Sequence, residues 1–382
     1  MAVTIKTGTL STDKILSALQ KPEVLDKVIL AEAHVAPMYA LLRNRLKKQV
    51  ALQPEFSHFE DQLAPTWTTV AADATATDTT ISVAAGTGYY FRAGDVVLVP
   101  STGEQMLVTS VASDSITVTR GYGATSAAAI SSGAYLLNTG PSKQEGAEAD
   151  NASYTEPTQV SNYIQEFSEL LAFTDIQRAS ETYGGPEEKR QINKKRWEIL
   201  RSIEYRFLFG EPKLDTSVSP PRRLTGGLSY FVTTNVADYS SSFDEDKWNE
   251  WLEGVFSLEG GSPKKTIFCG GKLIRNLMSV LQSNYTVRTE VAKGTWGLKI
   301  VSYTSPFGEV ELIHHKLLKN DYSSYGFAVD FEYLQYRYMK GMDLRLIDIQ
   351  TENPHVKKYE YHAAVGLDVL NEKAMGIIIT PA

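Results

Sequence analysis

Apolar residues recur with the period of a helix in one long segment of the chain, residues 186–209. The apolar positions that share one helix face are Ile192, Ile199, Leu200, Ile203 and Phe207. Pro186 suits the first turn of a helix, and Gly210 suits the position after the last turn. The pattern therefore predicts a helix of about 23 residues, which would be roughly 35 Å long.

Residues 66–139 follow a different pattern, in which apolar and polar residues alternate with a period of two over short runs. Thr, Ser, Ala, Gly and Val dominate this stretch, and lysine and histidine are absent from it. The runs are separated by turn signals and span Thr79–Val83, Asp95–Val99, Gln105–Val111 and Ser115–Thr119. Because the composition changes at both ends, we predict an inserted β-module, a small all-β barrel or sandwich.

Two strand-like segments flank the β-module, residues 51–65 and 156–173. Their apolar positions include Phe56, Phe59, Ile164 and Phe167. Strands on either side of an insertion can pair with each other, so these two segments are predicted to form a long hairpin stem. Residues 140–155 are polar, and we predict a loop there.

The first 50 residues contain short amphipathic segments separated by breaks. Their apolar residues include Ile15, Leu16, Leu19 and Leu25. None of these segments is long enough to form a stable helix alone in water. They must pack on their own domain or on a neighbouring subunit, and the pattern does not distinguish the two.

Residues 224–382 alternate helix and strand signals, which is typical of an α+β fold with an antiparallel sheet and helices beside it. The predicted helices are Asp244–Leu258 and Leu273–Leu281. The predicted strands are Lys265–Cys269, Leu298–Tyr303, Val310–His314, Phe327–Gln335, Leu344–Ile349 and Lys358–Val365.

The charge and cysteine content narrow the classes of protein to consider. The formal net charge is −7, so the overall charge does not require the protein to have a strongly basic face. The single cysteine, Cys269, excludes an intrachain disulfide and a cysteine-built zinc site, and we predict that it is a buried structural thiol. The sequence has no secretory signal pattern and no apolar run of about 18 residues, so we expect no membrane contact and folding in a cytoplasm.

The usual catalytic motifs are missing from the sequence. It contains no G-x-S-x-G elbow, no H-E-x-x-H motif and no P-loop. His314 and His315 adjoin each other in a predicted strand, so their rings should point to opposite faces and cannot share one metal ion. We therefore expect no catalytic residues, no cofactor and no metal ion.

Two basic clusters stand out against the negative net charge. The first cluster consists of Arg43, Arg45, Lys47 and Lys48. The second cluster lies on the predicted long helix and consists of Lys189, Arg190, Lys194, Lys195 and Arg196. Each cluster is either a solvated helix face or a surface that faces a polyanion.

Four local phrases, in the same order along the chain, resemble the SU-ten-like family of tailed-bacteriophage major head proteins, which have the Hong Kong 97-like capsid fold. The phrases are APMYALLRNRL…FSHFEDQLAP, TQVSNYIQEFSELLAF, Leu224–Leu228 with Thr234-Asn235-Val236, and Leu367–Gly376. Together they cover most of residues 36–65 and 156–380. The sequence departs from the family pattern at Met375, where the family often has His, and in the inserted β-module.

The resemblance implies a division of the chain into capsid domains. Residues 1–50 would be the N-terminal arm, 51–65 and 140–173 the strands of the extended loop, and 66–139 the inserted β-module. Residues 174–236 and 341–382 would form the peripheral domain, with residues 186–209 as its spine helix. Residues 237–340 would form the axial domain.

The resemblance also implies partners and contact residues. The chain would assemble with itself into hexameric and pentameric capsomers of an icosahedral head, built in the host cytoplasm around double-stranded DNA. Scaffolding, portal and decoration proteins would be further partners. The expected subunit-interface residues are Ile15, Leu16, Leu19, Leu25, Phe56, Phe59, Ile164 and Phe167. The expected genome-facing basic stripe is Lys189, Arg190, Lys194, Lys195 and Arg196.

Two other functions fit the sequence as well. An encapsulin-type shell protein would share the fold and enclose cargo proteins in a cell. A carbohydrate- or ligand-binding protein would use the aromatic residues of the β-module, Tyr89, Tyr90, Phe91 and Tyr122, as a binding platform.

Overall fold

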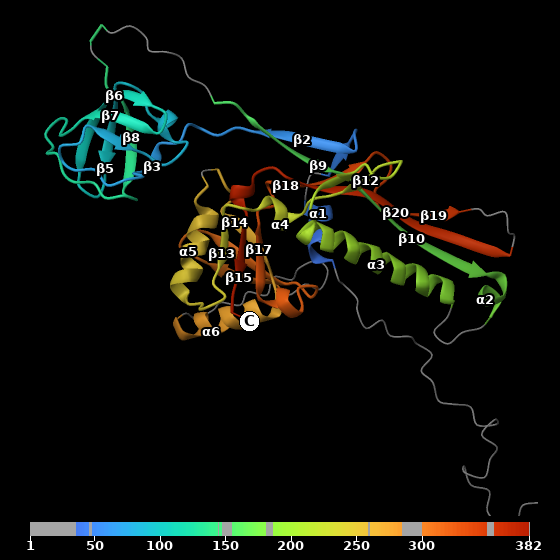
Figure 1. The fold of residues 1–382 in the computed structure, drawn as a ribbon. Coiled ribbons are helices and arrows are strands. Elements are labelled where there is room, and N and C mark those ends of the chain that lie inside the picture. The colour runs from blue at the N-terminus through green and yellow to red at the C-terminus, as the bar shows by residue number, and fades with distance from the viewer. Residues whose placement is uncertain are drawn as a thin grey trace, which may run out of the picture. The chain divides into compact units, whose positions relative to one another are not determined.

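The computed structural model describes residues 36–45, 48–143, 145–146, 155–180, 186–258, 260–284, 300–349 and 355–381. The predicted interface residues Ile15, Leu16, Leu19 and Leu25 lie outside these ranges. The described chain divides into two compact units (Figure 1). Unit 1 holds the residues up to His58 and from Val160 onward, and unit 2 holds Phe59–Gln159.

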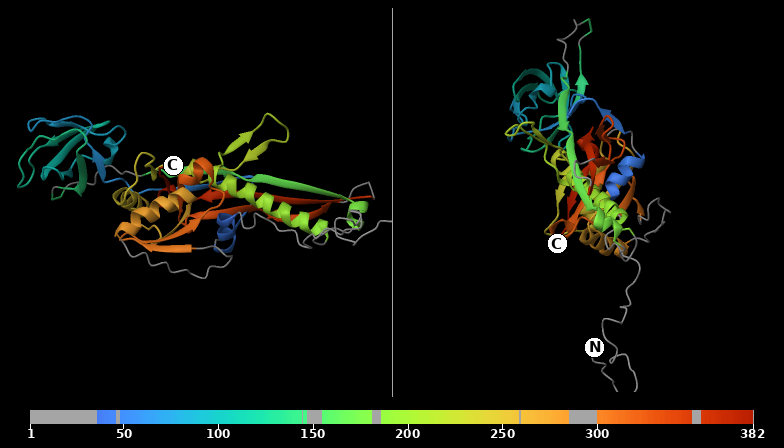
Figure 2. Two further views of the ribbon diagram at one scale, coloured as in Figure 1. Left: turned by 90° about the horizontal axis from the view of Figure 1, so that it is seen from below. Right: turned by 90° about the vertical axis from the view of Figure 1, so that its right-hand side faces the viewer.

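The first sheet of unit 1 runs in the order β1-β18-β20-β10, and β19 also pairs with β20. Its strands are β1 (Gln49–Ala51), β10 (Gln165–Thr174), β18 (Leu334–Met339), β19 (Arg345–Ile349) and β20 (Val356–Val369). The long helix α3 (Glu187–Phe209) lies along this sheet beside β10, as both views in Figure 2 show. The sheet and the helix share the largest core of the molecule, which includes Phe167, Ile203, Phe207, Tyr336 and Val365.

Helix α3 confirms the helix predicted over residues 186–209. Pro186 is its N-cap residue and two glutamates occupy its first turn, where negative charge is favourable. Gly210 follows the last helical residue, and a Cβ atom there would lie 2.4 Å from the carbonyl oxygens of Arg206 and Thr225. The helix therefore ends at a position that only glycine can occupy without moving the backbone.

The second sheet of unit 1 runs in the order β13-β21-β17-β14-β16-β15. Its strands are β13 (Val236–Asp238), β14 (Lys264–Cys269), β15 (Ile300–Thr304), β16 (Glu309–His314), β17 (Tyr325–Val329) and β21 (Gly376–Ile379). Helices α5 (Glu245–Phe256) and α6 (Gly271–Asn284) share a core with Ile267 and Cys269 of β14, whereas Phe268 belongs to the core of α3. Successive residues of β14 thus point into two different cores on opposite faces of the sheet. This sheet is therefore a central layer of unit 1.

Both sheets of unit 1 are mixed, whereas the sequence predicted an antiparallel sheet. β14 pairs in parallel with β16, β13 with β21, and β1 with β18. The predicted single strand Phe327–Gln335 is also wrong, because β17 ends at Val329 and β18 begins at Leu334 in the other sheet. The buried Asp330 stabilises the turn between them, since its carboxylate accepts hydrogen bonds from the Glu332 and Ser262 amides and from Lys265 Nζ.

The predicted hairpin stem is shorter than expected. Strand β2 (Glu55–Glu60) pairs with β9 (Thr158–Tyr163), but the next strand, β10, pairs along its whole length with β20. Alternating polarity shows which face of a strand is buried, but it does not identify the neighbouring strand. The remaining short elements of unit 1 are α1 (Pro37–Arg45), α2 (Asp175–Ala179), β11 (Lys213–Asp215), β12 (Arg222–Leu224) and α4 (Leu228–Phe231).

Helix α1 is held on α3 by a buried carboxylate. Glu204 is fully buried, and its oxygens accept hydrogen bonds from the Met38 amide at 2.7 Å and the Tyr39 amide at 2.8 Å. His315, which is also fully buried, lies with its Nε2 2.7 Å from Glu204 Oε1. Because the Leu317 amide donates to His315 Nδ1, the hydrogen of a neutral His315 is on Nε2 and points at Glu204.

Unit 2 is a six-stranded antiparallel barrel with its own core. Its strands are β3 (Trp67–Thr69), β4 (Thr80–Ser82), β5 (Asp95–Val99), β6 (Glu104–Ala112), β7 (Ser115–Thr119) and β8 (Tyr135–Pro141). They run in the order β3-β8-β5-β6-β7-β4, and a bridge between Val70 and Val83 joins the two outer strands. This closure leaves few strand edges unpaired. The core of the barrel consists of thirteen buried residues, which include Val97, Met106 and Ile116.

The structure confirms the four strands predicted in the β-module and adds β3 and β8. β8 extends to Pro141, two residues beyond the predicted end of the module at 139. Its residues Asn138 and Gly140 are not typical of a strand, so the sequence pattern did not reveal it.

A buried ion pair ties together the turns at one end of the barrel. Arg120 donates through Nε and Nη2 to the two oxygens of Glu104, each at 2.8 Å. The Gly121 and Ala128 amides also donate to Glu104. Burial acts to raise the pKa of Glu104, but Arg120 and the two amides outweigh burial and hold this pKa below its ordinary value of 4.5.

We predict that residues 66–143 fold alone, because the barrel has a closed sheet and a separate core. The excised module should give a dispersed NMR spectrum and unfold cooperatively. Since the folded pKa of Glu104 is depressed, its stabilising contribution is present above pH 4.5 and is lost as the pH falls through the folded pKa. The melting temperature should therefore fall on acidification, and the Glu104→Gln variant should show a smaller fall. A disordered module would contradict this prediction.

A second prediction concerns Glu204. Replacing Glu204 by Ala leaves two amides and His315 without their buried acceptor, so the free energy of unfolding of the full chain should decrease by about 3–5 kcal/mol. Glu198→Ala on the same helix is the matched control, because Glu198 makes only surface pairs with Lys194 and Lys195 and should change stability by about 0–1 kcal/mol. Equal losses in the two variants, measured by chemical denaturation, would show that Glu204 does not hold α1.

Candidate functional site

The described residues do not assemble a metal centre. No group of three or more His, Cys, Asp or Glu side chains in the described ranges is placed to hold a metal ion. His314 is exposed and His315 is fully buried, which confirms that their rings point to opposite sides. Cys269 is fully buried, as predicted, and burial raises the pKa of its thiol far above the ordinary value. Within the described ranges, no helix is long and apolar enough to cross a membrane.

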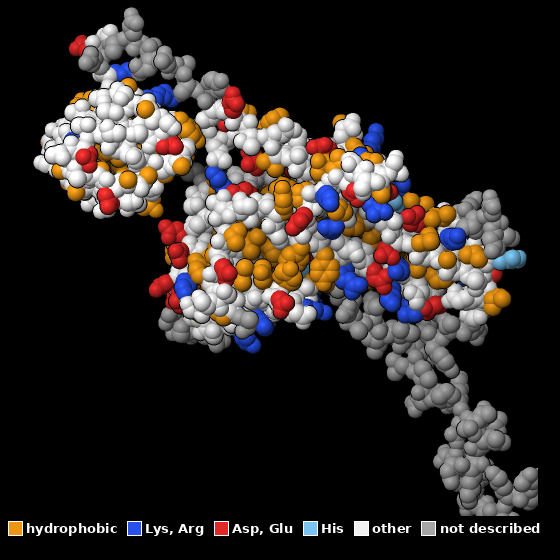
Figure 3. All heavy atoms as spheres, viewed as in Figure 1, with side chains coloured by type: hydrophobic (Ala, Val, Ile, Leu, Met, Phe, Trp, Pro, Cys, Tyr) orange, Lys and Arg blue, Asp and Glu red, His pale blue; other side chains and the backbone are white. Residues whose placement is uncertain are grey.

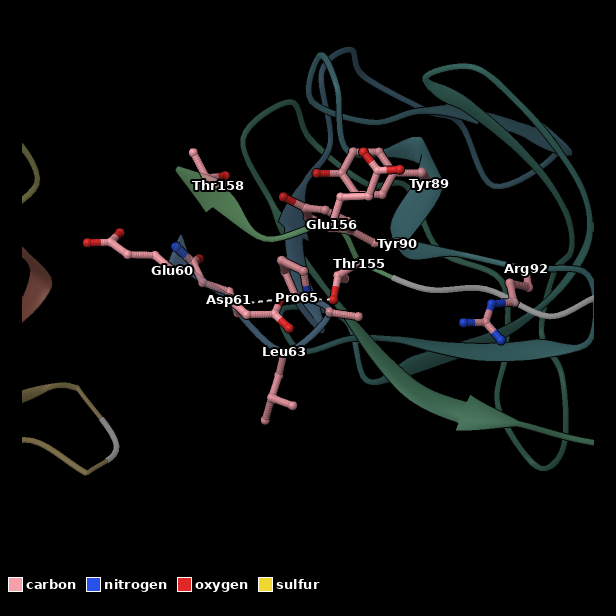
Figure 4. Close-up of a pocket in the computed structure, with 12 residues that line it drawn as sticks. Glu60, Asp61, Leu63, Pro65, Tyr89, Tyr90, Arg92, Thr155, Glu156 and Thr158 are labelled. Carbon is pink, nitrogen blue, oxygen red and sulfur yellow. Dashed lines mark hydrogen bonds between the residues drawn. The ribbon is translucent and has the colours of Figure 1, made fainter. Parts of the chain in front are cut away.

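Unit 2 contains a wide hollow of about 840 Å³, shown in Figure 4. Its lining includes Tyr89, Tyr90, Arg92, Asp61 and Glu156. Thr155 Oγ1 donates to Asp61 Oδ1 at 3.2 Å across it. The lining mixes carboxylates, one guanidinium and two aromatic rings, and it brings together no nucleophile with an adjacent base.

The predicted aromatic platform of the β-module does not form as expected. Phe91 belongs to the barrel core and is 3% exposed. Tyr89 and Tyr90 lie edge to face, with ring centroids 4.7 Å apart, and both line the hollow, whereas Tyr122 does not. Two of the four rings are therefore together in one place, which weakens the ligand-binding hypothesis.

Three of the predicted interface residues pack inside unit 1. Phe56, Ile164 and Phe167 are at most 9% exposed and belong to its cores. Phe59, in contrast, is 69% exposed near the end of β2, and the nearby Leu63 is 90% exposed. The alternation of β2 explains the difference, because Phe56 and Phe59 are an odd number of residues apart and point to opposite faces. Sequence reasoning missed Leu63, which follows the strand.

The five predicted basic residues of α3 do not form one stripe. Successive helix residues are about 100° apart, so positions 189, 190, 194, 195 and 196 occupy more than one face. Arg190 pairs with Glu187, and Lys195 pairs with Glu169 and Glu198. Lys189, Lys194 and Arg196 are exposed. In the first basic cluster, Arg43 and Lys48 both pair with Asp343, and the side chains of Arg45 and Lys47 lie outside the described residues.

Comparison with known proteins identifies the family. The model of the SU10 major capsid protein family matches residues 5–381. A major capsid protein of Pseudomonas phage PaMx41 is 23% identical over 299 residues, which cover 72% of this chain and 69% of that protein.

Solved capsid structures have the same fold. The capsid of an empty GTA particle superposes with a TM-score of 0.51 at 9% identity, covering 97% of this chain and 98% of that chain. A structure from Mycobacterium phage Bobi superposes with a TM-score of 0.52 at 7% identity, covering 98% and 100% of the two chains. The two mixed sheets, the long helix α3 and the β2–β9 hairpin are thus elements of a Hong Kong 97-like capsid fold. The chain belongs to the SU10 major capsid protein family.

Proposed function

We propose that this major capsid protein assembles with itself into hexameric and pentameric capsomers and closes an icosahedral shell around the double-stranded DNA of a tailed phage. The match of the family model to residues 5–381 carries the proposal. Residues 1–50 act as the N-terminal arm, and the β2–β9 hairpin acts as the extended loop. Scaffolding, portal and decoration proteins are the further partners, and assembly takes place in the host cytoplasm.

The family match favours a phage head over the encapsulin-type shell. The ligand-binding alternative has less support, because the hollow in unit 2 gathers only two of the four expected aromatic rings. Expression of the full chain tests the proposal, with gradient sedimentation and electron microscopy as the readouts. Closed shells or capsomers are the expected result. A protein that stays monomeric at every concentration and salt level would overturn the proposal.

The exposed apolar residues of the extended loop should contribute to shell formation. Phe59→Ser/Leu63→Ser removes two side chains that are 69% and 90% exposed, so stability should change by less than about 0.5 kcal/mol. The yield of particles should fall, because apolar surface that a neighbour covers in the shell is lost. Leu214→Ser, at an exposed leucine of β11, is the control and should assemble normally. Full yield from the double variant would contradict this role.

Lys189 and Arg196, two exposed basic residues seven positions apart and therefore on one face of α3, are proposed to face the packaged genome. Phosphate contacts of this kind are sequence-independent and weaken with salt. Lys189→Gln/Arg196→Gln should leave the yield of empty shells unchanged and reduce the salt concentration that DNA-filled heads withstand. Arg190→Gln, at a residue already paired with Glu187, is the control. Filled heads with unchanged salt tolerance would identify these residues as a merely solvated face.

A further inference from the structure

Helix α5 presents three carboxylates on the side opposite its buried face. Trp248, Trp251, Leu252 and Val255 are buried in the core beneath it. Asp246, Glu250 and Glu253 are exposed, and their spacing of four and three residues places them within about 60° around the helix. We call these three residues the acidic face. Among the described residues, Tyr239 Oη donates to Glu250 at 3.3 Å, but no salt bridge joins the acidic face to a cation.

A second surface of unit 1 carries the opposite charge. It consists of Lys272 and Arg275, one turn apart on α6, and Lys316, just beyond the end of β16. We call these three residues the basic surface. His314 lies between the two parts of this surface. Its Nε2 atom is close to Gly271, which directly precedes Lys272, since a Cβ atom built on Gly271 would lie 3.7 Å from it. Lys316 follows His314 by two residues. Burial has the largest effect on the pKa of His314 and lowers it, and the positive charge of Lys316 lowers this pKa further.

The two surfaces lie on different borders of unit 1. α5 and α6 share one core but run along separate edges of the unit (Figure 1). Figure 3 shows acidic side chains gathered over α5 and basic side chains near α6. Among the residues that the structure describes, no salt bridge joins the acidic face to the basic surface within one copy of the chain.

We propose that the acidic face of one copy docks on the basic surface of a second copy, and that this contact sets the direction of the ring in a capsomer. The inference rests on the proposed function, because it assigns the surfaces that would join neighbouring copies. Like charges facing each other are unfavourable, so neither surface can make a two-fold symmetric contact with itself. Opposite charges on two separate borders instead favour a head-to-tail contact, which closes into a ring.

Charge complementarity selects a second copy as the occupant. Nucleic acid would occupy the basic surface alone and would be repelled by the acidic face. A second copy satisfies both surfaces at once, and every copy in a ring uses each surface once. Electrostatic contacts of this type steer association and are screened by salt, so ring formation should be slower at high ionic strength.

Charge reversal on the full chain tests the proposal. Asp246→Lys/Glu250→Lys/Glu253→Lys makes both surfaces positive, and Lys272→Glu/Arg275→Glu/Lys316→Glu makes both negative. Each variant alone should form about tenfold fewer particles than the unmodified chain, measured by gradient sedimentation. The combined variant with all six substitutions exchanges the two charges and should recover assembly. Glu211→Lys/Glu332→Lys/Asp348→Lys, at three exposed acids elsewhere in unit 1, controls for net charge and should assemble normally.

Mixing the two reversed proteins adds a sharper readout. Positive and negative copies must then alternate around a ring, which is possible in a hexamer and impossible in a pentamer. The mixture should therefore form hexamers, sheets or open tubes in electron micrographs, without closed shells. Closed shells from the mixture would overturn the proposed direction of contact.

Two other outcomes would also overturn the proposal. The first is normal assembly of both reversed variants. The second is a combined variant that does not assemble, although its melting temperature and circular dichroism match those of the unmodified chain. These failures differ from failure of the proposed function, in which the unmodified chain itself would not assemble. Loss of DNA retention with normal assembly of the basic-surface variant would assign that surface to nucleic acid instead.

Discussion

The buried carboxylate of Glu204 is the constraint around which unit 1 is arranged. A polar side chain in a core is tolerated only when hydrogen-bond partners satisfy it. Its donors come from α1 and from His315, which directly follows β16 in the second sheet. The start of α1, the later part of α3 and the end of β16 must therefore meet at one point, and this fixes how α1 joins the body of unit 1.

Unit 2 follows the opposite design, because nothing in its own core depends on unit 1. Barrel closure pairs its outer strands, and the Glu104–Arg120 pair stabilises its turns without a residue from outside the module. A closed module with these properties can lie between β2 and β9 in the sequence while these two strands still pair with each other.

Local periodicity was sufficient to predict α3, α5 and strands β5 to β7, because each of these elements buries one face of its own segment. Pairing depends on contacts between distant residues, and no local pattern encodes the partnership of β10 with β20 or the parallel pair β14–β16. The turn at Asp330 was missed for the same reason, since its partner Lys265 is 65 residues away. Glu204 did leave a signal in the sequence, as an acidic residue within the apolar stripe of the predicted helix.

The predicted interface residues show how folding and assembly divide the apolar surface. Phe56, Ile164 and Phe167 are used for folding, and Phe59 and Leu63 remain exposed on the extended loop. The net charge of −7 makes copies of the chain repel one another at long range. In the proposed assembly, contacts between copies would have to overcome this repulsion through local charge complementarity as well as burial. Weak contacts allow misplaced subunits to dissociate before the shell closes, whereas a large apolar interface would trap them.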